Sequence, residues 1–392
     1  MFFLFCMLCM GLGPLRTCAN TVYTPSQEEV DKLSGILDLA VKGRYPGTSR
    51  TRPGKIPGRT NPIWNQRTTI LYYHRRQAGR PIMWLTLAMG EIGNAKDIIS
   101  NKKTWMGIWK ETHPEEFTKM EKYIPKTWSD TDSFHSDMKE DSVYVYKPVL
   151  GHSGEGITFK TGYEMSKAMV DQEENGGPAQ WVIQEFVDPF LFDNKKTHMR
   201  VLTLIIVQPD GSREYFIYHK MRLFTAAEDF DEERLVGGGD NSHMLITNTV
   251  HNKLFFESKP ENRGKTFDSS TCLFDAETAL GSSDSSLSFE YVYSRSKIMH
   301  NTIYSILGDL VECKATDVSI YDDSCFHIMA SDVAFDREGK PFFLEMNNAM
   351  GYNIIWTDEE QSEFTRGVAS LVRGTSSPYH VDDSSMWERL SV

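Results

Sequence analysis

Hydrophobic and polar positions alternate most clearly between residues 326 and 351, FHIMASDVAFDREGKPFFLEMNNAMG. The alternation predicts two short strands joined by a turn over residues 337–341, where Gly339 and Pro341 supply the turn chemistry. Residues i and i+2 of a strand share a face, so Glu345 and Asn347 point the same way and Asp332 joins them across the hairpin. Three oxygen donors suit a Mg²⁺ ion that also holds nucleotide phosphates; the alternative is a hairpin with solvated carboxylates.

A second hairpin is predicted upstream, over VYVYKPVLGHSGEGITFK at residues 143–160. The β-branched and aromatic residues 143–146 favour a strand that ends at Lys147, and a second strand starts at Ile157. The loop between them carries Gly151, Gly154 and Gly156, which permit backbone N–H groups to approach an anion. A lysine at the strand end adds a positive charge for phosphate. The loop is not a Walker A sequence, because no Gly-Lys-Ser/Thr opens a helix after it.

Two apolar strands flank a polar excursion in WVIQEFVDPFLFDNKKTHMRVLTLIIV, residues 181–207. The second is almost continuously apolar apart from Arg200 near its start, and Arg222 repeats the pattern in FIYHKMRLFT. Buried arginines are rare unless an anion pairs with them, which indicates either a structural salt bridge or a bound phosphate. Together the segments supply the charge set that a Mg-triphosphate needs. Its members are Lys147, Lys196, Arg200, Arg222, Asp332 and Glu345.

At this point the sequence resembles the tubulin–tyrosine ligase-like family, a branch of the ATP-grasp ligases. The resemblance rests on five elements that occur in the family's order between about residues 95 and 350. They are YIPKTW (123–128), KPVLGHSGEGI (147–157), VIQEFVDPFLFDNKKTHMR (182–200), HMLITNTVHNK (243–253) and SDVAFDREGKPFFLEMN (331–347).

The resemblance implies an α/β (α+β) ATP-grasp fold with antiparallel and mixed sheets, in which central and C-terminal subdomains hold ATP between them. It also implies a role for each matching residue. Nucleotide-binding residues are expected at Lys147, Gly154, Gly156, Ile157, Gln184, Glu185, Phe186, Val187, Lys196 and Arg200. Residues at the γ-phosphate or the acceptor are expected at Arg200, Arg222, Asn248 and Lys253. Mg²⁺ ligands are expected at Asp332, Glu345 and Asn347.

The implied reaction joins a carboxylate to the amine of a free amino acid through an acyl phosphate made from ATP. Alignment and charge neutralisation carry such a step, so no side-chain nucleophile is required. The implied acceptor is an acidic protein or peptide such as a tubulin tail, and tyrosine, glutamate and glycine are equally compatible as the added amino acid. Two competing interpretations are a ligase with a non-tubulin acceptor in the secretory pathway and a nucleotide-binding pseudoenzyme.

Two positions depart from the family pattern. His198 stands where the family usually has an acid, and Ser153 stands where it usually has a base. The first change puts ribose or acceptor contacts in doubt, and the second removes one expected phosphate or substrate contact. Because the metal ligands and the cations are intact, the sequence supports ATP binding better than it supports any one acceptor.

Charge is distributed unevenly along the 392 residues, whose net charge is −12. An acidic balance argues against general nucleic-acid binding. Residues 39–90 nevertheless contain ten Lys or Arg and no Asp or Glu. This segment suits an acidic partner, or it is a solvated arm rich in Gly, Pro and Arg.

The first 20 residues contain an apolar run, FFLFCMLCMGLG, that is too short to cross a bilayer. Thr17, Cys18 and Ala19 resemble a cleavage site for a secretory signal, although the usual basic start is missing; a misassigned start or a buried N-terminal segment are the alternatives. Of six cysteines three lie in this leader, and an odd number remains, which predicts no disulfide framework. The compartment is therefore secretory if the leader is cleaved, and cytoplasmic or cytoskeletal otherwise.

The predicted organisation has five parts. They are a possible signal peptide (1–19), a helix with a basic irregular arm (20–67), an N-terminal α/β subdomain (68–135), a central subdomain (136–205) and a C-terminal catalytic subdomain (206–392). Apolar spacing predicts helices over 26–43, 296–315 and 359–373, the second of them behind the metal hairpin. The Ser-rich acidic stretch at 269–288 is interpreted as a surface insertion, and no transmembrane segment is predicted.

Overall fold

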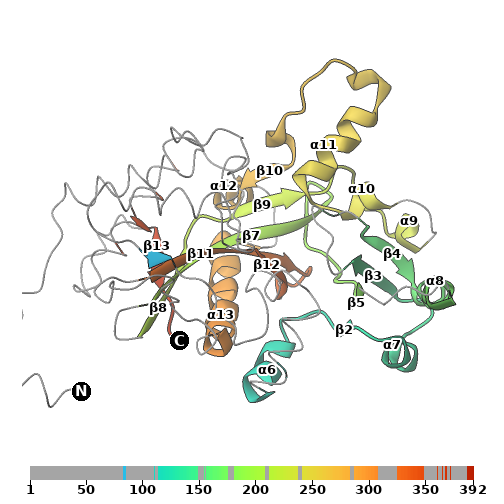
Figure 1. The fold of residues 1–392 in the computed structure, drawn as a ribbon. Helices are drawn as coiled ribbons and strands as arrows, with labels where there is room; N and C mark the ends of the chain where they lie inside the picture. The colour runs from blue at the N-terminus through green and yellow to red at the C-terminus, as the bar shows by residue number, and fades with distance from the viewer. Residues whose placement is uncertain are drawn as a thin grey trace, which may run out of the picture.

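The structure is a computed structural model in which two β-sheets and their helices are arranged side by side (Figure 1). It describes residues 83–84, 110, 114–148, 154, 156–174, 181–207, 212–236, 241–282, 287–307, 325–347, 360, 364, 367–368, 371 and 386–392. The predicted leader, the 26–43 helix and nearly all of the basic segment lie outside these residues. Among the described residues no helix is long and apolar enough to cross a membrane.

The larger sheet is built around β7 (Lys195–Val207), a long strand that pairs with β11 on one side and with β8 and β9 on the other. Its path runs β1-β11-β7-β8-β13, while β12 pairs with β11, β6 with β7, and β9 with both β7 and β10. The other bounds are β1 (Met83–Trp84), β6 (Leu191–Phe192), β8 (Arg213–Tyr218), β9 (Arg222–Thr225), β10 (Leu273–Asp275), β11 (Cys325–Phe335), β12 (Pro341–Asn347) and β13 (Trp387–Arg389). All of its pairings are antiparallel except β1 with β11, which makes the fold a mixed α/β arrangement with antiparallel sheets.

The smaller sheet has the order β2-β5-β3-β4. Its strands are β2 (Thr127–Trp128), β3 (Val143–Pro148), β4 (Thr158–Thr161) and β5 (Trp181–Glu185). The β3–β4 hairpin confirms the two strands predicted on either side of the glycine-rich loop. Edge-to-face aromatic packing fills its core, with the rings of Phe134 and Tyr144 5.1 Å apart and those of Trp128 and Phe134 5.5 Å apart.

Helices cover both sheets. They are α6 (Pro114–Glu121), α7 (Thr131–Asp137), α8 (Gly162–Glu174), α9 (Glu232–Val236), α10 (Ser242–Leu245), α11 (Thr249–Ser258), α12 (Ala276–Ser282) and α13 (Phe289–Leu307), with 3-10 turns at Pro260–Asn262 and Ser269–Thr271. The positions that the structure describes between 360 and 371 are helical, in line with the last predicted helix.

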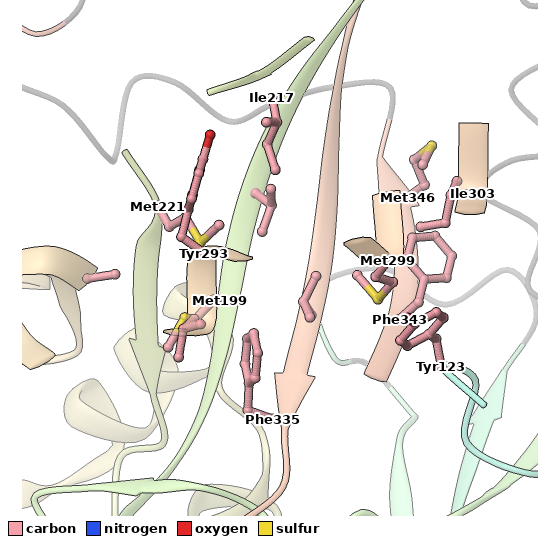
Figure 2. Packing of buried hydrophobic residues seen from close by; sticks show 14 of the residues in the cluster. Tyr123, Met199, Ile217, Met221, Tyr293, Met299, Ile303, Phe335, Phe343 and Met346 are labelled. Atoms are coloured by element: carbon pink, nitrogen blue, oxygen red, sulfur yellow. The ribbon is translucent and has the colours of Figure 1, made fainter. Parts of the chain in front are cut away.

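Helix α13 packs behind the β11–β12 hairpin, as predicted, but begins seven residues earlier than the apolar spacing had indicated. Its inner face carries Met299 and Ile303, which lie beside Phe343 and Met346 of β12 in the main core (Figure 2). Ile298, expected on that face, is 46% exposed. The part of the prediction beyond residue 307 lies outside the described residues.

The prediction of a surface insertion at 269–288 is wrong. Within it β10 pairs with β9, and Ala276, Ala279 and Leu280 of α12 are at most 5% exposed in the main core. The apolar residues that α12 buries are present in the sequence. The many serines and acidic residues around them nevertheless favoured the interpretation of a solvent-exposed segment.

Candidate active site

The β11–β12 hairpin brings the predicted metal ligands together. Asp332 lies directly opposite Glu345 in the strand register, and a register shift follows between Asp332 and Val333. The turn is closed by Asp336, whose Oδ1 accepts from the backbone N–H groups of Glu338 and Lys340. The sequence alternation therefore predicted both the hairpin and the face that carries its polar side chains.

Asp332 is 7% exposed and is held by charged hydrogen bonds. Arg200 Nε and Nη2 donate to its Oδ1 and Oδ2 at 2.8 and 2.9 Å. Asn347 Nδ2 donates to Asp332 Oδ2 at 3.3 Å and to Glu345 Oε1 at 3.5 Å. Burial works to lower the pKa of Arg200, but attraction and hydrogen bonding to Asp332, with help from Glu345, outweigh it and raise that pKa.

His198 occupies the same region as a buried, neutral imidazole. Its Nδ1 lies 2.5 Å from Thr247 Oγ1, its Nε2 lies 3.7 Å from Asp332 Oδ1, and its ring stacks on Phe224 with centroids 4.6 Å apart. Burial first, and then repulsion from Arg200 and Lys196, hold its pKa well below the usual range. His198 is one of the two positions at which the sequence was expected to depart from the family pattern, and the effect of this neutral ring on ribose or acceptor contacts stays a prediction.

A cavity of about 200 Å³ lies where the smaller sheet meets the β7–β11–β12 face of the larger one. Twelve of the predicted site residues line it: Lys147, Gly154, Ile157, Gln184, Glu185, Phe186, Val187, Lys196, Asn248, Asp332, Glu345 and Asn347. The segments that carry them are far apart in sequence, so their convergence is a property of the fold. The larger sheet contributes the oxygen donors and Lys196, whereas β3 contributes Lys147, and the end of β5 with the residues after it contributes the hinge, defined as residues 184–187.

The two lysines of the cavity have different surroundings. Lys147, at the end of β3, donates to Gln184 Oε1 on the neighbouring β5. Lys196 has no carboxylate within ion-pair distance among the described residues, and burial lowers its pKa to about 8. A partly buried ammonium group that lines a cavity, with no carboxylate partner among the described residues, is suited to an anionic ligand.

Two glycines of the predicted phosphate loop, Gly154 and Gly156, adopt conformations that other residues rarely take. Gly154 has φ of 83°, and a Cβ there would lie 2.8 Å from Cγ2 of Ile246. Gly156 has φ of 72°. Gly151 and Ser153 lie outside the described residues, so the effect of the serine stays a prediction.

Four predicted residues do not line the cavity: Gly156, Arg200, Arg222 and Lys253. Arg200 donates to Asp332, which itself lines the cavity. Arg222 donates instead to Asp275 Oδ2 at 3.1 Å and Glu360 Oε2 at 2.7 Å. Lys253 is exposed on α11, where its ammonium lies 3.7 Å from Glu257. Sequence spacing alone could not separate these roles, because each depends on which strand or helix packs alongside.

Other residues of the cavity were missed, notably Thr247, Phe159 and Ala334. Two could have been found from alternation, since Phe159 pairs with Val145 across the β3–β4 hairpin and Ala334 lies two residues after Asp332. Thr247 carries no such signal, because it precedes α11 in a non-repetitive segment. Asn248, next to it, caps α11 by accepting from the N–H groups of Val250 and His251.

Within the described part of the chain, no group of three or more His, Cys, Asp or Glu side chains is arranged to hold a metal ion. The hairpin set differs from such a group because it combines two carboxylates with an amide. Two carboxylates are what Mg²⁺ commonly takes from a protein when phosphates and water complete its shell.

Comparison with known proteins identifies the family. The model of the tubulin-tyrosine ligase family matches residues 94–349, which is more than half of the chain. The chain therefore belongs to the tubulin-tyrosine ligase family. This match confirms the resemblance and covers every element described around the cavity.

Curated relatives match at low identity. Tubulin polyglutamylase TTLL7 of Xenopus tropicalis is 24% identical over 283 residues, covering 67% of this chain and 28% of the relative. The TTLL7 of Homo sapiens is also 24% identical, covering 71% and 30%. A probable tubulin polyglutamylase, ttll-9 of Caenorhabditis elegans, is 22% identical over 239 residues, covering 57% and 51%. The chain thus spans less than a third of the length of the TTLL7 relatives.

Proposed function

We propose that this protein is an ATP- and Mg²⁺-dependent ligase that joins the carboxylate of an acidic protein to the amine of a free amino acid. The observation that carries the proposal is the cavity itself, which is lined both by Asp332, Glu345 and Asn347 and by Lys147 and Lys196. The two carboxylates and the amide suit a metal, the two lysines suit phosphate, and a ligase of this kind needs both at one place.

The residues fit a metal–nucleotide complex. Asp332, Glu345 and Asn347 would hold Mg²⁺, which when bound neutralises negative charge on the phosphates. Lys147 and Lys196 would contact phosphate oxygens, and the absence of a carboxylate partner for Lys196 among the described residues supports this assignment. Residues 184–187 would hold adenine through backbone groups, with Ile157, Phe159 and Ala334 forming apolar walls.

The chain's part in the reaction is binding, alignment and exclusion of water. The acceptor carboxylate would attack the γ-phosphorus to give an acyl phosphate and ADP. The amine would then displace inorganic phosphate and form the amide. In this scheme the cations hold the phosphates in line and oppose the charge that gathers as two anions meet, so no side chain forms a covalent bond.

Tubulin is the first acceptor to test, and glutamate the first amino acid, because the named relatives are tubulin polyglutamylases. Tyrosine and glycine belong in the same panel, together with non-tubulin acidic peptides. Release of ADP with each pair of substrates would identify the acceptor class.

The proposal is tested by thermal unfolding of the full chain with ATP and Mg²⁺. A ligand that binds only the folded state raises the midpoint by mass action. We expect a shift that requires Mg²⁺ and disappears in Asp332→Ala. A shift without ADP release on any acceptor would support the pseudoenzyme interpretation, and no shift at all would overturn nucleotide binding.

A further inference from the structure

Five charged residues form one straight row across five strands of the larger sheet. Glu345 of β12 is opposite Asp332 of β11, Asp332 is opposite Arg200 of β7, Arg200 is opposite Arg222 of β9, and Arg222 is opposite Asp275 of β10. Directly paired residues project from the same face of a sheet. The row therefore presents its charges side by side, in the order two acids, two arginines and one acid.

The two arginines at the centre of the row lean in opposite directions. Like charges directly opposite each other on neighbouring strands repel. Arg222 donates to Asp275 and Glu360, whereas Arg200 donates with two nitrogens to Asp332 and lies 5.2 Å over the ring of Phe224. The pairing of Arg200 with Asp332 is thus the arrangement that keeps the centre of the row neutralised.

This pairing uses the oxygens that the proposed metal needs. Arg200 Nε and Nη2 each occupy one carboxylate oxygen of Asp332, and Asn347 adds a third donor at Oδ2. A divalent cation beside Asp332 would compete for these oxygens and would also be repelled by the guanidinium. Metal binding becomes favourable once Arg200 has another anion to pair with.

The neighbouring residues of β7 show where such an anion would arrive. Lys196, His198 and Arg200 alternate along the strand and share one face, and the first two line the cavity. A phosphate bound by Lys196 would therefore lie over the face of β7 that also carries Arg200. The side chain of Arg200 is long enough to turn from a carboxylate on β11 toward the same cavity.

We propose that Arg200 is a resident counter-ion that occupies Asp332 until a nucleotide arrives and then exchanges the carboxylate for phosphate oxygens. The exchange makes metal binding depend on nucleotide, and suppresses binding of the metal alone. This inference rests on the proposed nucleotide site but makes a separate claim, namely that Arg200 opposes the metal when no phosphate is present.

The test is a titration of the full chain with Mn²⁺ alone, in which electron paramagnetic resonance counts the free ion. We expect Arg200→Gln to bind Mn²⁺ about tenfold more tightly than the wild type, because a positive charge beside the ligands is gone. The same substitution should weaken binding of ATP without metal. A residue that merely stabilised the fold would not strengthen metal binding.

Three controls define the result. Arg337→Gln removes an exposed arginine from the turn of the same hairpin, where it pairs with Asp188 and Glu232, and should leave Mn²⁺ binding unchanged. Arg200→Lys keeps the charge and should stay close to the wild type. Adding Asp332→Asn to Arg200→Gln should abolish the gain, which would place the ion at this carboxylate.

Unaltered Mn²⁺ binding in a folded Arg200→Gln variant would overturn the inference. If that variant does not fold, the wild type decides: Mn²⁺ alone bound as tightly as Mn²⁺ with ATP would equally overturn it. These failures differ from failure of the proposed function, in which the wild type would show no Mg²⁺-dependent ATP shift at all.

Discussion

The two sheets that border the cavity differ in both core and chemistry. The smaller sheet rests on seven buried residues, largely aromatic, and contributes Lys147, the glycine loop and the hinge. The larger sheet is backed by the main core with α13 behind it, and contributes the acidic hairpin and the charges of β7. The acidic groups, whose relative positions must be held closely, lie on the better-supported element. Lys147 and the glycines, which are proposed to contact phosphate, lie on a hairpin with a smaller core.

Among the changes that test this difference between the two sheets, Glu345→Gln should have the largest effect. Losing one carboxylate from the hairpin should reduce turnover about a thousandfold, on the scale seen when a stabilising group of a transition state is removed. Folding should be preserved, because Glu345 is only partly buried and its strand is anchored by Phe343 and Met346. Turnover and circular dichroism measure the two effects.

Glu338→Gln is the matched control, because Glu338 is an exposed carboxylate in the turn of the same hairpin. It should retain full turnover. Unchanged turnover in Glu345→Gln would remove the basis for assigning the metal to this hairpin.

The core behind the larger sheet should lose stability as the pH falls. His300 of α13 is fully buried, and burial lowers its pKa from 6.5 to about 4. A lowered folded-state pKa means that the stabilisation is complete above pH 6.5 and is lost as pH falls toward 4. The loss amounts to about 3 kcal/mol of unfolding free energy.

Urea unfolding at a series of pH values checks this expectation. His300→Gln cannot take up the proton, so its unfolding free energy should depend less on pH across that window, whatever its absolute stability. An identical pH dependence in the two proteins would show that His300 does not control acid unfolding.

Lys147→Ala tests the smaller sheet. Removing one charged contact to phosphate should weaken ATP binding by about 1.5–3 kcal/mol. Isothermal titration calorimetry measures the change. Lys160→Ala is the control, because Lys160 pairs with Tyr144, on the face of the β3–β4 hairpin opposite to Val145 and Phe159, which line the cavity. Equal affinities in both variants would mean that the phosphate is held elsewhere.

The smallest expected effect is a pH dependence from Lys196. Its pKa of about 8 means that the amine is charged below pH 8 and neutral above it. Only the charged form attracts phosphate, so ATP affinity should fall about tenfold by pH 9. Lys196→Arg, charged throughout, should show no such fall in binding measured at pH 7 and pH 9.

The lowered pKa of Lys196 has the opposite effect on the stability of the unliganded protein, which should increase with pH. Because the folded-state pKa lies below the unfolded value of 10.5, stability should rise as pH increases from about 8 to 10.5. A fall in ATP affinity that persists in Lys196→Arg would assign the titration to another group.

Local patterns in the sequence determined the parts of the site that lie on single hairpins. Alternation was sufficient to predict β11 and β12 and the shared face of Asp332, Glu345 and Asn347, because the side chains of a strand repeat every two residues. Alternation and glycine content likewise predicted the β3–β4 hairpin and its loop. Neither inference required knowledge of a distant residue.

The tertiary structure decided which charges meet. Arg200 and Arg222 look alike in sequence, yet one pairs with Asp332 and the other with Asp275 and Glu360, because β7 and β9 have different neighbours. The burial of α12 in a Ser-rich stretch and the contact of His198 with Thr247 also depend on segments far apart in the chain. Strand order and packing set these contacts through long-range burial, which no local repeat in the sequence records.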